Sequence, residues 1–175
     1  MKRPPSTPAD ARGLRVLLLR SAFNASVVQG LVSGAREALR AMGAREGDVA
    51  EAEVPGAFEL PLAASAAARS GRFDAVVALG AVIRGETDHY EHIAREAASG
   101  LAAVARETGI PIGFGVLTVG DEEQARVRSA AGPENKGGEA ARAAVATARL
   151  VRSWLPRRAA RGRRGPAPRR GRSAV

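Results

Sequence analysis

Residues 73–101, FDAVVALGAVIRGETDHYEHIAREAASGL, decide the fold of this chain. The unbroken apolar run at residues 75–79 is typical of a strand that is covered on both faces. Gly80 and Gly85 are expected to bracket a polar turn, and a helix then carries both histidines, His89 and His92, in its first turns. Open α/β sheets place their ligands at a loop that follows a strand and opens a helix, so we expect the functional site here.

Strands and helices are predicted to alternate along the rest of the chain. Further strands are predicted at residues 14–19, 48–54 and 109–117. Further helices are predicted at residues 26–42, at residues 58–71, from residue 121 onward and at residues 139–154. This alternation favours right-handed crossovers between parallel strands. The predicted fold class is therefore α/β, with a four-stranded parallel sheet between two layers of helices.

Composition limits the classes of protein to consider. The chain has 175 residues, 45% of them hydrophobic but only 3% aromatic, so we expect one domain with an aliphatic core. It has no cysteine, which excludes disulfides, thiolate nucleophiles and cysteine metal ligands. It has no apolar run of membrane-spanning length and no apolar segment typical of a signal peptide near its start, so we expect a cytoplasmic protein that does not bind membranes.

The positive charge is concentrated at one end of the chain. Residues 1–151 contain 18 basic and 18 acidic side chains, whereas residues 152–175 contain nine arginines and no acid, which accounts for the net charge of +9. We predict a flexible segment at residues 1–13, a folded domain at residues 14–155 and a disordered Arg-rich tail at residues 156–175. Only the tail gives a reason to consider nucleic acid as a partner.

His89 is the candidate for proton transfer. Four loops, at residues 23–24, 56–59, 81–89 and 114–121, follow the predicted strands, so they meet at one edge of a parallel sheet. An imidazole at that edge can accept and donate a proton near neutral pH. The alternative is a surface histidine in the first turn of a helix. A metal site formed by His89 and His92 would lack a third ligand.

The loop before His89 is a candidate phosphate site. Backbone N–H groups and a hydroxyl at Gly85, Glu86 and Thr87 can bind a phosphate group at a helix N-terminus. The alternative is plain capping of the helix, with Thr87 or Asp88 as the N-cap and Glu91 completing a capping box, and the two interpretations are compatible. Arg128, on the helix after the fourth strand, could reach the same phosphate group, or it could be a solvated helix arginine.

Two aromatic residues stand in loops that are otherwise polar. Phe23 and Phe58 could stack on a flat ring of a ligand or pack beneath a loop. Glu59 could accept hydrogen bonds from sugar hydroxyls, or it could be an acid at a helix N-terminus.

Five motifs taken together resemble the 6,7-dimethyl-8-ribityllumazine synthase family. They are SAFN at residues 21–24, VPGAFELP at 54–61, LGAVIRGETDHY at 79–90, PIGFGVLT at 111–118 and NKGGEA at 135–140. They occur in the order and with the spacing of that family, and the resemblance extends over residues 14–154.

The resemblance implies a fold, a reaction and an assembly. The fold would be a flavodoxin-like three-layer α/β/α sandwich. The reaction would condense 5-amino-6-(D-ribitylamino)uracil with 3,4-dihydroxy-2-butanone 4-phosphate to 6,7-dimethyl-8-ribityllumazine, with release of phosphate and water and without a metal or cofactor. The chain would form a homopentamer or a multiple such as a decamer or 60-mer, with active sites between subunits. Residues 130–134 differ from the usual family sequence at a turn that influences shell assembly.

The resemblance also assigns roles to individual residues. His89 would transfer protons, and Phe23 would stack on the pyrimidine. The other residues implied for the ribitylaminouracil are Ala57, Phe58, Glu59, Ala81, Val82, Ile83, Lys136 and, from a neighbouring subunit, Phe114. The residues implied for the butanone phosphate are Gly85, Glu86, Thr87 and Arg128. The alternative function is a scaffold of the same fold that binds a flavin or lumazine without catalysis.

Overall fold

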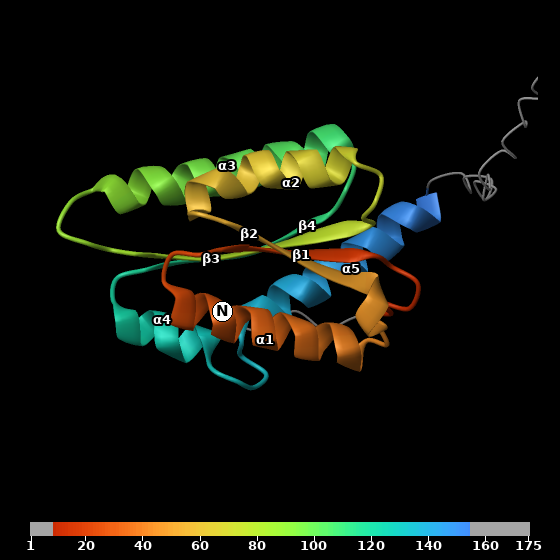
Figure 1. The fold of residues 1–175 in the computed structure, drawn as a ribbon, viewed down its shortest axis with the longest axis horizontal. Coiled ribbons are helices and arrows are strands. Elements are labelled where there is room, and N and C mark those ends of the chain that lie inside the picture. The colour runs from red at the N-terminus through yellow and green to blue at the C-terminus, as the bar shows by residue number, and fades with distance from the viewer. Residues whose placement is uncertain (1–8, 155–175) are drawn as a thin grey trace, which may run out of the picture.

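The computed structural model describes residues 9–154 as a parallel sheet between two layers of helices (Figure 1). The strands are β1 (Val16–Ser21), β2 (Val49–Val54), β3 (Ala75–Ile83) and β4 (Ile112–Val119). The helices are α1 (Ala25–Ala41), α2 (Leu60–Arg69), α3 (His89–Thr108), α4 (Glu122–Ser129) and α5 (Lys136–Trp154), with 3-10 turns η1 (Glu46–Asp48) and η2 (Ala57–Glu59). The strand order is β2-β1-β3-β4, so the predicted fold class is confirmed.

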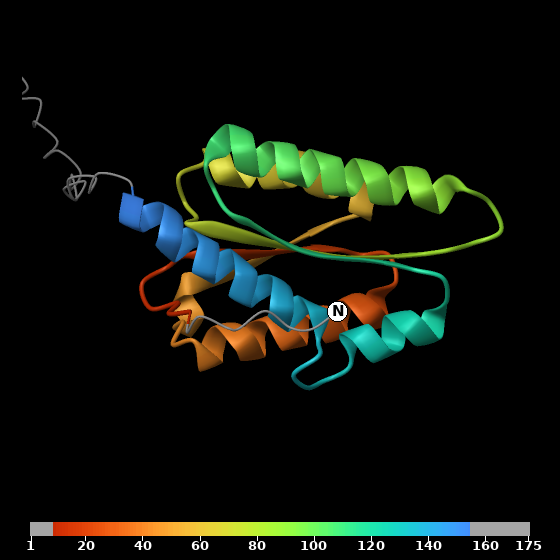
Figure 2. The same ribbon diagram turned by 180° about the vertical axis from the view of Figure 1, so that it is seen from behind.

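Each face of the sheet supports its own core. Figure 1 and the reverse view in Figure 2 show α2 and α3 on one face and α1, α4 and α5 on the other. Successive residues of β1 point to opposite faces of the sheet and so belong to different cores. Val16 and Leu18 pack toward α1 and α5, whereas Leu17 and Leu19 pack toward α2 and α3. The largest fully buried side chains are all leucine or valine, which confirms the aliphatic core.

The central strand β3 is longer than the sequence predicted. It continues through Gly80 to Ile83, whose register partner on β4 is Val119, so the expected turn at Gly80 was wrong. A Cβ atom on Gly80 would lie 3.1 Å from the Ser21 hydroxyl and 3.4 Å from a Leu60 methyl group. This glycine therefore allows close packing inside the sheet rather than a change of chain direction.

Helix α5 also begins earlier than predicted. It starts at Lys136 rather than Glu139, because Gly137 and Gly138 belong to its first turn. A Cβ atom on Gly137 would overlap the backbone carbonyl of Leu31 on α1. The two glycines therefore let α5 approach α1 closely, which is a tertiary reason for residues that locally resemble a loop.

The ends of the chain lie partly outside the described residues. The predicted Arg-rich tail and residues 1–8 of the predicted N-terminal segment fall there. Within the described part, Ala11 is buried and its N–H group donates to the carbonyl of Met42. No helix within residues 9–154 is long and apolar enough to cross a membrane.

Candidate functional site

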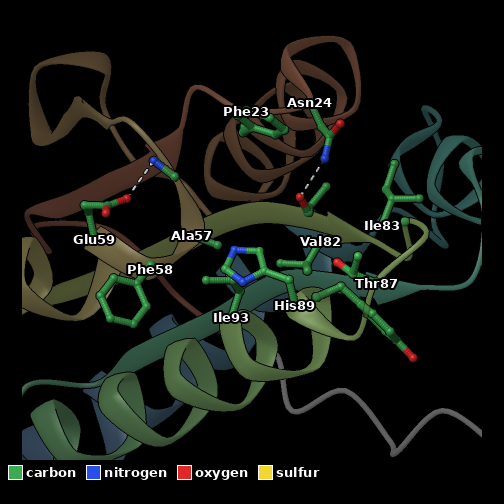
Figure 3. Close-up of a pocket in the computed structure, with 14 residues that line it drawn as sticks. Phe23, Asn24, Ala57, Phe58, Glu59, Val82, Ile83, Thr87, His89 and Ile93 are labelled. Carbon is green, nitrogen blue, oxygen red and sulfur yellow. Dashed lines mark hydrogen bonds between the residues drawn. The ribbon is translucent and has the colours of Figure 1, made fainter.

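A pocket of about 400 Å³ opens at the carboxyl ends of β1 and β3 (Figure 3). Its walls come from the loop after β1, from η2, from the end of β3 and from the first turns of α3. Its lining residues are Phe23, Asn24, Gly56, Ala57, Phe58, Glu59, Ala81, Val82, Ile83, Gly85, Thr87, His89, Tyr90 and Ile93. The carboxyl ends of the parallel strands bring these segments together, although Phe23 and Ile93, the most distant of the lining residues, are 70 positions apart in the sequence.

Ten of the fourteen predicted site residues line this pocket. They are Phe23, Ala57, Phe58, Glu59, Ala81, Val82, Ile83, Gly85, Thr87 and His89. Four predicted residues are not part of the lining within this chain: Glu86, Phe114, Arg128 and Lys136. The fold therefore brings most of the predicted site residues into one pocket. Of the four that are not in the lining, Glu86 belongs to the loop before α3, and the other three belong to β4, α4 and α5.

The residues outside the lining have different positions. Phe114 pairs with Ala78 in the sheet, three positions before the partner of Ala81, which is roughly 10 Å along the strand. Lys136 opens α5 on the opposite face of the sheet and forms an ion pair with Glu139 at 2.8 Å. Neither side chain is part of the pocket lining within this chain.

Phe23 is presented to the pocket by the end of β1. Its N–H group donates to the carbonyl of Pro55, which continues the β1–β2 hydrogen bonding past the strand ends. The side chain of Phe23 remains 73% exposed. A ring fixed by its backbone and open to solvent on its face is suited to stacking on a planar ligand. The alternative, packing beneath a loop, does not fit this exposure.

Asn24 fixes the adjacent corner of the pocket. Its φ angle is +56°, and it has the only positive φ of any non-glycine residue within residues 9–154. Its side-chain Nδ2 donates to the carbonyl of Ala81 at 2.8 Å, which Figure 3 shows as a dashed line. Asn24 therefore ties the start of α1 to the end of β3, on either side of the topological switch point between β1 and β3.

Glu59 is held by the turn that precedes α2. The N–H group of Gly56 donates to Oε2 of Glu59 at 2.9 Å, which closes a capping arrangement around η2. Beside it Phe58 is 56% exposed and Ala57 is buried. The turn thus presents an aromatic ring and a carboxylate at the same wall of the pocket.

The loop at residues 84–88 leaves the start of α3 open to a ligand. Asp88 stands at the N-cap position but makes no side-chain capping bond, and no side-chain oxygen within residues 9–154 caps this turn. The structure thus places Asp88 at the N-cap position, as the capping alternative predicted, but shows no side-chain capping bond from it. The exposed first-turn N–H groups and the helix dipole favour an anion at this end of the pocket.

Strong ion pairs belong to the scaffold rather than to the pocket. The carboxylate of Glu51 on β2 accepts a hydrogen bond from Arg36 at 2.7 Å and another from Arg20 at 2.9 Å. The hydrogen bond from Arg36 and then that from Arg20 lower the pKa of Glu51, partly offset by burial. Within residues 9–154 there is no group of three His, Cys, Asp or Glu side chains that could hold a metal ion.

Sequence reasoning missed four lining residues. They are Asn24, Gly56, Tyr90 and Ile93. Asn24 carried a signal, because asparagine directly after a strand is one of the few residues that readily adopts a positive φ. Ile93 carried a different signal, since its helical spacing indicates core packing; it packs against the core under α2 and α3 and also lines the pocket.

We expect substitution of Asn24 to separate its backbone role from its side-chain role. Asn24→Ala removes the hydrogen bond to Ala81. It also leaves at positive φ a residue whose Cβ atom makes this backbone conformation unfavourable. Together these losses should lower the free energy of unfolding by about 1–3 kcal/mol. Asn24→Gly loses only the hydrogen bond, so it should cost about 1 kcal/mol less. Urea denaturation of both variants measures the difference, and equal stabilities would contradict this account of the corner.

Comparison with known proteins gives one consistent result. The sequence profile of the family described as 6,7-dimethyl-8-ribityllumazine synthase matches residues 13–152. A protein of that name from Nitrosomonas europaea is 49% identical over 142 residues, which cover 81% of this chain and 84% of the relative. A protein of that name from Kineococcus radiotolerans is 49% identical over 154 residues, which cover 87% of this chain and 94% of the relative.

Proposed function

The chain belongs to the 6,7-dimethyl-8-ribityllumazine synthase family, transferases of riboflavin biosynthesis, and from this premise we propose how its pocket works. The reaction condenses 5-amino-6-(D-ribitylamino)uracil with 3,4-dihydroxy-2-butanone 4-phosphate. The observation that carries the proposal is that ten of the predicted residues, from three separate motifs, line one pocket. A scaffold that binds without catalysis is not favoured, because His89 is kept at the centre of that pocket (Figure 3).

The pocket has an aromatic end and an anion-binding end. In Figure 3, His89 lies between the wall formed by Ala57 and Phe58 and the loop that carries Thr87. We assign the pyrimidine to Phe23 at the aromatic end and the ribityl chain to the turn that holds Glu59. The phosphate group is then assigned to the open start of α3, where backbone N–H groups and the Thr87 hydroxyl can donate to it.

Proton transfer is assigned to His89. Attack of the pyrimidine amine on the ketone carbonyl leaves an extra proton on nitrogen, and loss of the carbinol hydroxyl as water needs a proton on oxygen. Imine formation thus moves two protons from nitrogen to the oxygen that leaves as water, and one imidazole between the two substrates can carry each of them in turn. Departure of phosphate places negative charge on oxygens that N–H donors stabilise. The remaining acceleration comes from holding two substrates together in a reactive orientation.

Residues outside the lining are assigned to a neighbouring subunit or to the phosphate. We propose that Phe114 completes the pocket of a neighbouring protomer, since it is 46% exposed on the edge strand β4 and lies too far along that strand to reach its own pocket. Lys136 is assigned to the ribityl chain. Glu86, through its loop, and Arg128 are assigned to the phosphate group. The cytoplasmic location and the division into segments at residues 13 and 156 stay predictions.

The proposed assembly is a homopentamer or a multiple of it. We expect mass photometry of the purified protein to show species at five times the chain mass of 18.1 kDa, or at multiples of that pentamer. Mixed pentamers give a second readout. Subunits with His89→Ala and subunits with Phe114→Ala, each inactive alone, should regain turnover when they are unfolded and refolded together, because some interfaces then combine two intact halves. A monomeric, active protein would contradict the shared site.

Genetic complementation tests the function in a cell. A bacterial strain that lacks its own lumazine synthase grows only with added riboflavin. Expression of this chain should restore growth without riboflavin, whereas the His89→Ala variant, expressed at the same level, should restore growth poorly. Failure of the intact, soluble protein to restore growth would count against the proposed reaction.

A further inference from the structure

The described pocket lacks a cation for the phosphate group assigned to it. Within residues 9–154, no lysine or arginine is part of the lining, and the only carboxylate there is that of Glu59. A phosphate ester carries negative charge, which backbone N–H groups alone compensate only in part. Arg128, the arginine implied by the family resemblance, is outside the lining, and its Nη1 donates to the carbonyl of Gln124 in its own helix at 3.1 Å. Another positive charge close to the loop would therefore matter.

Arg84 is the first residue of the loop at residues 84–88 that carries the phosphate assignment. It follows β3 directly and precedes Gly85, and its backbone N–H group donates to the carbonyl of Val119 at 2.9 Å. Its backbone is thus anchored to the sheet at the point where the loop leaves it. The side chain starts from a fixed position beside the open N-terminus of α3.

The guanidinium of Arg84 lies over an aromatic ring that lines the pocket. Its central carbon is 5.7 Å from the centroid of Tyr90, the residue after His89. Within the described residues Arg84 makes no ion pair, in contrast to Arg20, Arg36 and Arg45, each of which pairs with a carboxylate. Within residues 9–154 its guanidinium makes no side-chain hydrogen bond, and its one contact is with the face of Tyr90, which itself lines the pocket.

We infer that Arg84 is a phosphate-binding residue of this site and that Tyr90 holds its guanidinium at the pocket rim. The inference rests on the proposed function for the identity of the ligand, a small phosphate ester. A charge-assisted hydrogen bond to phosphate is stronger than an exposed cation–π contact. The ring therefore orders the side chain without competing seriously with the phosphate. A guanidinium offers two parallel N–H donors to one phosphate group, which an ammonium cannot match.

Steady-state kinetics on Arg84 variants tests this role. Arg84→Gln should raise KM for the butanone phosphate, and the inhibition constant for inorganic phosphate, by about 10- to 100-fold. KM for the ribitylaminouracil should change by less than about twofold, because that substrate carries no phosphate. Arg84→Lys should recover part of the loss, since it keeps the charge but not the fork of donors. Arg95→Gln removes an exposed charge on the same helix as Tyr90 and should leave all three constants unchanged.

Each outcome decides for or against Arg84. If the inhibition constant for inorganic phosphate is the same in Arg84→Gln as in Arg95→Gln, the inference is overturned. Equal increases in KM for both substrates also overturn it, since they would mark Arg84 as a support of the loop as a whole. If the wild-type protein shows no turnover, the proposed function fails on its own account. Calorimetric titration of the wild type and Arg84→Gln with inorganic phosphate then still decides whether Arg84 binds the anion.

Discussion

Replacement of His89 by alanine is expected to lower kcat for lumazine formation by about 10²- to 10⁴-fold, the usual contribution of a positioned acid–base group. His89 is the first residue of α3, and its imidazole lines the pocket between the wall of Ala57 and Phe58 and the loop that carries Thr87. It is the only histidine in the lining within residues 9–154, so no second imidazole is placed to substitute for it. Absorbance and fluorescence of the lumazine product give the rate, with the slow uncatalysed reaction subtracted. Circular dichroism checks that the variant remains folded.

His92 provides the matched control for this substitution. It lies one turn further along α3, is exposed and is not part of the pocket lining. His92→Ala should therefore keep kcat and both KM values within about twofold of the wild type. Turnover in His89→Ala that equals turnover in His92→Ala would return His89 to a minor role and leave positioning of the substrates to supply the rate.

Replacement of Asn135 by alanine is expected to lower the free energy of unfolding by about 3–5 kcal/mol. Asn135 is only 2% exposed, and its Nδ2 lies 2.8–3.1 Å from the carbonyl oxygens of Ser129, Gly30 and Ala130. Its Oδ1 accepts from the N–H group of Gly138 at 3.0 Å. One amide thus joins α1, the end of α4 and the start of α5, and its removal leaves several buried polar groups without a partner.

Two further variants make the test of Asn135 specific. Asn135→Asp keeps an acceptor for Gly138 but turns a carboxylate toward backbone carbonyls, so it should be destabilised as well. Glu134→Ala changes the exposed preceding residue and should shift the free energy of unfolding by no more than about 0.5 kcal/mol. Urea denaturation gives all three values. An Asn135→Ala variant as stable as Glu134→Ala would show that the buried amide does not hold these helices together.

The sheet was predictable because each strand carries its own local signal. The run at residues 75–79 has no polar interruption, as a strand buried on both faces requires, and the alternating residues 48–54 became the exposed edge strand β2. The convergence of distant loops was predictable as well, since all parallel strands end at one edge. The predicted geometry of the sheet alone therefore indicated that Phe23, Glu59 and His89 could share a pocket.

Glycines account for the main errors in the prediction of elements. Gly80 was assigned to a turn, a common use of glycine, and Gly137 lay outside the helix predicted from residue 139. The structure places both inside regular elements, where a Cβ atom on Gly80 would crowd the Ser21 hydroxyl and one on Gly137 would overlap the Leu31 backbone. Which residue approaches a glycine is a tertiary property, so no local pattern around residue 80 or 137 could reveal it.

Other parts of the site could not be predicted from the residues of one chain. Phe114 and Lys136 were singled out by motif rather than by geometry, and the fold puts both away from the pocket of this chain. The Arg84–Tyr90 contact was missed because a cation over a ring depends on the path of a loop, which no periodicity in the sequence records. A role for Arg84 could therefore be argued only from the structure.

The most direct test of the account is the rate at which the purified protein forms 6,7-dimethyl-8-ribityllumazine from the two substrates. We expect turnover well above the uncatalysed reaction, with one phosphate released for each lumazine formed and no requirement for an added metal or cofactor. Omission of either substrate should abolish both signals. A folded, oligomeric protein that gives no rate above the uncatalysed reaction would contradict the central claim and would leave a scaffold that binds its ligand without transforming it.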